Sequence, residues 1–185
     1  MTITQKMEEF YEVRTELHIR LYNYYASQID LYREQSGEEP WRLTESRHDQ
    51  SKLEEPERTP YILITWDYRC KDRGIAWNPP PDIKTLMSDA TFHHVRNNPH
   101  HPEYWVKNLQ RQDRENRDAP GNTPVDASAM PDKHIAEMVG DWMAMSREKG
   151  TEPKAWADRN VNIRWEFTPH QVGLIYDLIQ NVWKE

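Results

Sequence analysis

The chain has 185 residues, of which 31 are acidic and 24 basic, and its formal net charge is −7. This length suits one domain with a core of its own, and 8 Trp, 9 Tyr and 7 Met supply enough large apolar side chains to exclude extended disorder. The acidic balance gives no global attraction to nucleic acid or to an anionic membrane surface. A single cysteine, Cys70, excludes an internal disulfide and a cysteine-based zinc framework, so any metal must be held by His and carboxylates.

No apolar run approaches the roughly 18 residues that would span a bilayer. Residues 1–10 also lack the basic segment and apolar stretch of a secretory leader. We therefore expect a cytoplasmic protein made of one helical domain over residues 1–185.

The first predicted element is a long amphipathic helix over residues 4–36, and Gly37 follows as its stop. Its apolar positions recur at intervals of three and four, which is the period of a helix. His18 lies at the edge of this predicted stripe. The stripe comprises Met7, Phe10, Leu17, Leu21, Tyr24 and Leu31.

Three shorter helical segments are predicted in the next part of the chain. Thr44 precedes a short helical segment that carries His48 and Asp49. A helix over residues 61–73 should end at Gly74. A third helix should begin after Asp82, which can cap it, and run through His93 and His94 until Pro99 interrupts it; residues 100–105 then open a new segment.

Residues 110–132 are polar and contain three prolines and a glycine, so we predict a flexible surface loop or insertion there. A strongly periodic helix over residues 132–149 should end at Gly150. The last helix should have Thr168 as its cap and Pro169 at its first position, and residues 161–167 could be extended. These elements predict an all-α domain of about six helices.

Four of the eight histidines lie within nine residues, as the pairs His93-His94 and His100-His101. Adjacent side chains on a helix point about 100° apart, so one member of a pair can face the core while the other leans outward. The bend at Pro99 lets the second pair return toward the first. The alternative is a solvated polar bend, which fits a doubled pair less well than a single histidine.

Further candidate ligands lie far away in the sequence. His48-Asp49 combines an imidazole nitrogen, which Zn, Mn or Fe accept, with a carboxylate that can bridge to the same metal. Asp141 flanks the apolar face of its predicted helix, a costly position for an acid that has no partner or metal. His18 alone would look like an ordinary core histidine.

The order His…His-Asp…His-His…His-His…Asp resembles the HD-domain superfamily of helical metal-dependent phosphohydrolases. The segments 48–52, 93–105 and 137–142 look more narrowly like a small uncharacterised bacterial and phage family inside or close to it, with the His-His-Pro-Glu-Tyr-Trp run at 100–105 as the specific element. The resemblance covers residues 16–149. It implies a HD-like helical bundle and a metal held by His18, His48, Asp49 and Asp141.

Superfamily members with two metals use the Asp of the doublet as a bridge and further histidines for the second ion. The resemblance thus implies one or two divalent transition-metal ions, such as Mn, Fe, Zn or Co, and the second ion would be held by residues among His94, His100 and His101. We assign the second ion to His94 and His101, and leave His93 and His100 as contacts to substrate or to the ligands, because neighbours on a helix diverge.

Substrate phosphate needs positive charge near the metal, and Lys52 is the best placed cation, followed by Arg96 and then Arg14. Asn98 is a further substrate-binding candidate, and Glu103 could orient a histidine or act as a base. No glycine-rich phosphate loop is present, which excludes a P-loop enzyme.

The leading hypothesis is a metal-dependent hydrolase of a phosphorylated small molecule, with a nucleotide as the expected substrate from resemblance alone. A di-iron oxygenase built on the same architecture is the second, because an imidazole-rich ligand set suits iron equally well. The third is a non-catalytic helical binding protein.

Overall fold

The computed structural model describes residues 3–111 and 123–184 of the chain. The predicted all-α class is confirmed, because helices make up most of these residues. Three 3-10 turns connect the helices: η1 (Leu43–Glu45), η2 (Gln50–Leu53) and η3 (Pro102–Trp105). The α-helices that lie wholly within the described ranges are α1 (Gln5–Gln35), α2 (Arg58–Arg73), α3 (Ile83–Asn97), α5 (Asp132–Lys149), α6 (Pro153–Asn160) and α7 (Pro169–Val182).

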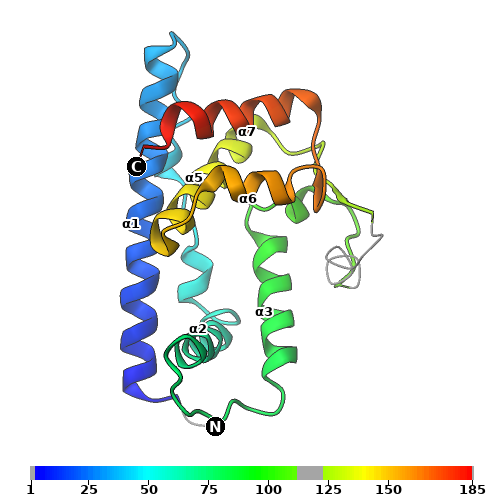
Figure 1. Ribbon diagram of the computed structural model, residues 1–185. Coiled ribbons are helices and arrows are strands. Elements are labelled where there is room, and N and C mark those ends of the chain that lie inside the picture. Colours follow the sequence, from blue (N-terminus) through cyan, green and yellow to red (C-terminus); the bar gives the residue numbers. More distant parts are fainter. Residues whose placement is uncertain (1–2, 112–122, 185) are drawn as a thin grey trace.

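Helix α1 runs the whole height of the molecule and is the support on which the other helices are arranged (Figure 1). Helices α5 and α7 pack against α1 and against each other, and α6 packs on both. At the other end α2 packs on α1, and α3 stands beside α2. The chain therefore forms two helical groups that share α1.

Each group of helices has its own apolar core. The first joins the C-terminal half of α1 to α5 and α7 through fully buried side chains such as Tyr22, Ile135 and Leu178. The second joins the N-terminal end of α1 to α2 and α3 through Met7, Tyr11, Ile62, Cys70 and Ile83. Between them α1 buries Thr15 and His18, so a polar layer separates the two cores.

The buried face of α1 differs from the predicted stripe by about one position along the helix. The residues that α1 buries are Met7, Tyr11, Thr15, His18, Tyr22, Tyr25, Ala26 and Ile29. Leu17 is 43% exposed, and Tyr24 and Leu31 are exposed as well. The apolar pattern selected the wrong face because the true one carries tyrosines and two polar residues. His18 consequently lies in the middle of the buried face and not at its edge.

Helix ends follow the predicted stop and start signals closely. Gly74 and Gly150 end α2 and α5 in the left-handed conformation that glycine adopts without strain. Thr168 accepts a hydrogen bond from the backbone of Gln171, whose side chain accepts one in return from the backbone of Thr168. These terminal predictions are confirmed.

The segment predicted as a loop or insertion over residues 110–132 is partly structured. Residues 112–122 lie outside the described residues. After them β1 (Val125–Asp126) pairs in parallel with β2 (Trp165–Glu166), in the region expected to be extended. Val125, Ala127 and Met130 are buried in the first core, so the prediction of a surface loop is wrong for this half. The polar composition of the segment gave no sign of this strand pairing, because the pairing depends on residues 165–166, which are distant in the sequence.

Within the described residues, no helix combines the length with the apolar character that crossing a bilayer requires.

Two leucine substitutions test which face of each helix is buried. Leu178 in α7 is fully buried, whereas Leu17 is 43% exposed. Leu178→Ala should lower the free energy of unfolding by about 2–5 kcal/mol, because it leaves a cavity in a packed core. Leu17→Ala should change it by about 0.5 kcal/mol at most. Urea denaturation of both variants measures the difference. Equal losses of unfolding free energy would show that Leu17 lies on the buried face, as the sequence pattern predicted.

Candidate metal centre

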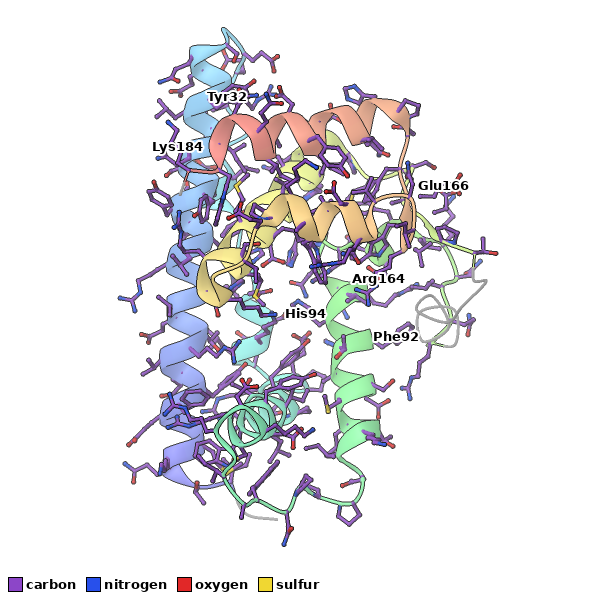
Figure 2. All side chains as sticks on the ribbon, viewed as in Figure 1. Tyr32, Phe92, His94, Arg164, Glu166 and Lys184 are labelled. Carbon is purple, nitrogen blue, oxygen red and sulfur yellow. The ribbon has the colours of Figure 1, made fainter. Side chains whose placement is uncertain are left out.

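Imidazoles and carboxylates from separate elements gather in the polar layer between the two cores. Figure 2 shows His94 at the C-terminal end of α3, on the side that faces α1. Five of the seven members are buried, and the other two, His101 and Asp141, are partly exposed. The cluster consists of His18 from α1, His48 and Asp49 from the link between η1 and η2, His94 from α3, His100 and His101 from the bend before η3, and Asp141 from α5.

The first group contains the four residues that the resemblance implied for one metal. Nε2 of His18 lies 3.0 Å from Oδ1 of Asp141 and 3.4 Å from Oδ2 of Asp49. Nε2 of His48 lies 3.6 Å from the same Asp141 oxygen and 3.9 Å from the same Asp49 oxygen. The structure therefore brings all four together, although α1 and α5 are far apart in the sequence.

The second group is formed by three histidines. One nitrogen from each of His94, His100 and His101 lies within 4.8 Å of the others. Nε2 of His94 lies 3.2 Å and Nε2 of His100 3.6 Å from Oδ1 of Asp49. These three imidazoles and one carboxylate oxygen can surround a second ion.

Asp49 links the two groups, because its Oδ2 faces His18 and His48 while its Oδ1 faces His94 and His100. Its side chain is 1% exposed. The backbone of Asp49 is left-handed, with φ 57°, at the entrance to η2, a conformation that Asp tolerates better than most residues. The expected helix through His48 and Asp49 is thus wrong: a tight turn aims both side chains inward where a helix would spread them.

Local backbone geometry also decides which histidines meet. On α3 the neighbours diverge as expected, since the His94 side chain is 3% exposed and that of His93 is 41% exposed. His100 and His101 lie outside any α-helix, and both reach the cluster. The assignment of His100 to substrate contact is therefore corrected: the structure places it among the candidate ligands, because the divergence rule applies only to helical neighbours.

Three carboxylates lie behind the imidazoles, and two of them are within hydrogen-bond distance of a ring nitrogen. Nδ1 of His18 lies 2.7 Å from Oε1 of Glu148, and Nδ1 of His94 lies 2.9 Å from Oε2 of Glu57. Nδ1 of His48 lies 3.5 Å from Oε1 of Glu137. An outer carboxylate on one ring nitrogen turns the other nitrogen toward the metal, and this arrangement is typical of histidine ligands.

Sequence reasoning did not assign these three outer acids to the site. Glu137 and Glu148 lie four residues before and seven after Asp141, a spacing that places all three on one face of α5. That spacing was a usable signal. Glu57 precedes α2 and had no such signal, because it reaches His94 only through the tertiary packing of α2 on α3.

Several buried atoms of the cluster have no hydrogen-bond partner among the described residues: Nε2 of His18, His94 and His101, both ring nitrogens of His48, and Oδ1 of Asp49. Burying a polar atom without a partner costs free energy. A group of such atoms in one place therefore indicates a common ligand. Imidazole nitrogens with carboxylate oxygens are the donors that divalent transition metals prefer. The residues present therefore fit metal ions.

Charges within the cluster are strongly coupled. Burial opposes ionisation of Asp49, but Lys52 and nearby imidazoles outweigh it and hold the carboxyl pKa well below its usual value. Burial opposes protonation of His18, yet Asp141 and Glu148 outweigh it and raise its pKa to about 10. Binding a metal at His18 must therefore release a proton.

Two histidines of the second group behave differently, because burial outweighs the carboxylates near them. Burial lowers the pKa of His100 to about 3, and His48 contributes in the same direction. Burial also lowers the pKa of His101, together with its neighbours His100 and His94. Both imidazoles are therefore neutral near pH 7, with a lone pair available for a metal.

Three of the predicted substrate contacts adjoin the cluster or the residues that surround it. Lys52 donates from Nζ to Oδ2 of Asp49 at 2.5 Å. Asn98 donates from Nδ2 to the backbone oxygen of His94 at 2.8 Å and to Oγ of Ser51 at 3.1 Å. His93, half-exposed, lies with Nδ1 2.7 Å from Oε1 of Glu57. Asn98 thus contacts the candidate ligand His94 itself, and His93 contacts Glu57, the acid behind His94.

Arg96 and Glu103 contact residues outside the cluster, whereas Arg14 approaches Glu148, the acid behind His18. Arg96 donates to the backbone oxygen of Val106 at 3.4 Å, and Arg14 lies 3.7 Å from Glu148. Glu103 is fully buried and accepts a hydrogen bond from Nε1 of Trp165. That bond ties Glu103 to β2.

The fold and the site define an all-α protein with buried His/Asp groups that are able to bind metal ions. The chain belongs to a family of unknown function, DUF5662, whose model matches residues 7–181. The matched region contains every candidate ligand from His18 to Asp141. No curated protein and no solved structure matches the chain.

Replacing Asp49 tests the link between the groups. Asp49→Ala should reduce the metal content of the purified protein to below one ion per chain, because both groups lose a carboxylate oxygen. Elemental analysis measures the content, and circular dichroism verifies the helical fold. Asp67→Ala is the control, since Asp67 is a buried acid of α2 that pairs with Lys71 away from the cluster. Unchanged metal content in Asp49→Ala would contradict the assignment.

The second group can be tested with neighbouring histidines. His94→Ala or His101→Ala should lower the metal content toward one ion per chain, because His18, His48 and Asp141 still hold the first ion. His93→Ala is the matched control and should leave the content unchanged, since the His93 ring is half-exposed and bonded to Glu57. If His94→Ala and His101→Ala both keep the metal content of the wild type, the second group binds no ion.

Proposed function

We propose that this protein is a metal-dependent phosphohydrolase that acts on a small phosphorylated compound such as a nucleotide. The observation that carries the proposal is the Asp49 carboxylate, whose two oxygens face two separate groups of imidazoles. A carboxylate in this position can hold two ions close together. Paired ions are typical of enzymes that displace a group from phosphorus.

The candidate ligands divide between two ions of Mn, Fe, Zn or Co. His18, His48, Asp141 and Oδ2 of Asp49 would hold the first. His94, His100, His101 and Oδ1 of Asp49 would hold the second. When bound, such ions neutralise phosphate charge and bring the pKa of water near 7, so the reaction requires no protein nucleophile.

Lys52 supplies the positive charge that phosphate requires. Burial opposes protonation of its amine, but Asp49 outweighs burial and raises the pKa of Lys52 above its ordinary value. The amine is therefore charged at neutral pH and lies against the carboxylate that joins the two groups. A fixed cation beside the reacting phosphate stabilises the negative charge that develops on its oxygens.

One observation supports a second candidate function, a di-iron oxygenase. The two groups contain five imidazoles but only two carboxylates, Asp49 and Asp141. Imidazole suits iron as well as zinc, so this ligand set can also serve oxygen chemistry. Lys52 favours the hydrolase, because a cation beside the cluster attracts an anionic substrate.

The deciding experiment combines elemental analysis with a screen for phosphate release. We expect one or two transition-metal ions per chain, and release of phosphate from a nucleotide or sugar phosphate that stops with EDTA and returns with Mn²⁺ or Co²⁺. Asp141→Asn is the matched variant and should abolish release, since Asp141 faces both His18 and His48.

Other outcomes overturn the proposal in distinct ways. An oxygen-sensitive visible band in iron-loaded protein, with no phosphate release, would favour the oxygenase. Absence of transition metal, with no thermal shift on adding Mn²⁺ or Fe²⁺, would identify a non-catalytic binding protein.

A further inference from the structure

A polar pocket of about 490 Å³ adjoins the metal cluster. His48 and His100 form part of its wall, so the pocket and the candidate ligands share two imidazoles. The rest of the wall comes from the turn around Arg47, the C-terminal end of α3 at Asn97, and the first turn of α5 at Lys133. A ligand in this pocket would therefore lie next to the cluster.

The charges of the pocket favour an anion. Arg47 and Lys133 both line it, and neither forms an ion pair within the described part of the chain. Lys133 also lies in the first turn of α5, an 18-residue helix, where backbone N–H groups add partial positive charge. Glu54 contributes one exposed negative charge, whereas Glu137 is turned toward the Nδ1 atoms of His48 and His134.

The neutral part of the wall is hydrophilic. Gln50, Ser51 and Asn97 offer hydrogen bonds, and Pro99 is the one residue without a polar side chain among those that line the pocket. Of the described residues, no Phe, Tyr or Trp lines it. Small-molecule sites are ordinarily lined by apolar and aromatic side chains, so this pocket suits a strongly solvated, oxygen-rich group.

We infer that this pocket binds a phosphate-bearing, non-aromatic part of the substrate through Arg47 and Lys133. The inference rests on the proposed function and narrows the class of substrate. The substrate would carry a second anionic group besides the reacting phosphate, and the pocket would recognise that group and not a stacked nucleobase. Arginine offers a planar pair of donors that matches phosphate oxygens, and lysine adds a point charge from the first turn of α5.

Pyrophosphate is the probe for the test, titrated calorimetrically into the protein as purified. Arg47→Gln and Lys133→Gln should each weaken binding about tenfold, because each removes a charge-assisted hydrogen bond. Arg73→Gln and Lys84→Gln are the matched controls: both side chains are exposed, and neither lines this pocket. The controls should leave the affinity unchanged, and adenosine should not bind.

The same titration after dialysis against EDTA separates binding by the pocket from binding by the metal ions. The difference in pyrophosphate affinity between the wild type and the pocket variants should persist without the ions. Equal affinities in wild type and both pocket variants would overturn the inference, as would adenosine binding as tightly as pyrophosphate.

Failure of the inference and failure of the proposed function give different results. Phosphate release with unchanged KM in Arg47→Gln and Lys133→Gln would retain the hydrolase and reject the pocket. Binding that depends on Arg47 and Lys133, without phosphate release from any compound, would reject the hydrolase and retain the anion pocket.

Discussion

A buried carboxylate, Asp49, is the constraint on which the site depends. Its side chain is 1% exposed, and both oxygens face imidazole nitrogens. A charge at that depth requires compensation from every side. Lys52, two groups of histidines and the ions proposed for them supply it. The left-handed backbone at Asp49 brings this carboxylate to the centre, where four separate segments of the chain can meet it.

The two apolar cores hold these segments in register. Helix α1 passes through both, so His18 is fixed relative to α5 in one core and to α2 in the other. The polar layer can therefore contain unpartnered nitrogens without losing its shape, because dense packing above and below keeps each ring in place. Outer acids such as Glu57 and Glu148 then set the direction of each ring.

Much of the fold could be predicted from local signals. The stops at Gly74 and Gly150 and the cap at Thr168 depend on a few neighbouring residues, and the structure has all three. The face of α1 could not be predicted in this way. Its buried side carries Tyr22, Tyr25 and His18, whose partners come from distant segments, while Leu17 remains exposed.

The sequence by itself determined the residue types of the site, and the resemblance to the HD-domain superfamily implied four of its candidate ligands: His18, His48, Asp49 and Asp141. Only the tertiary structure decided that the neighbours His100 and His101 both reach the cluster, and that Glu57 orients His94. The physical reason is that convergence depends on backbone direction outside helices and on packing between helices. Neither of these two factors produces a periodic pattern in the sequence.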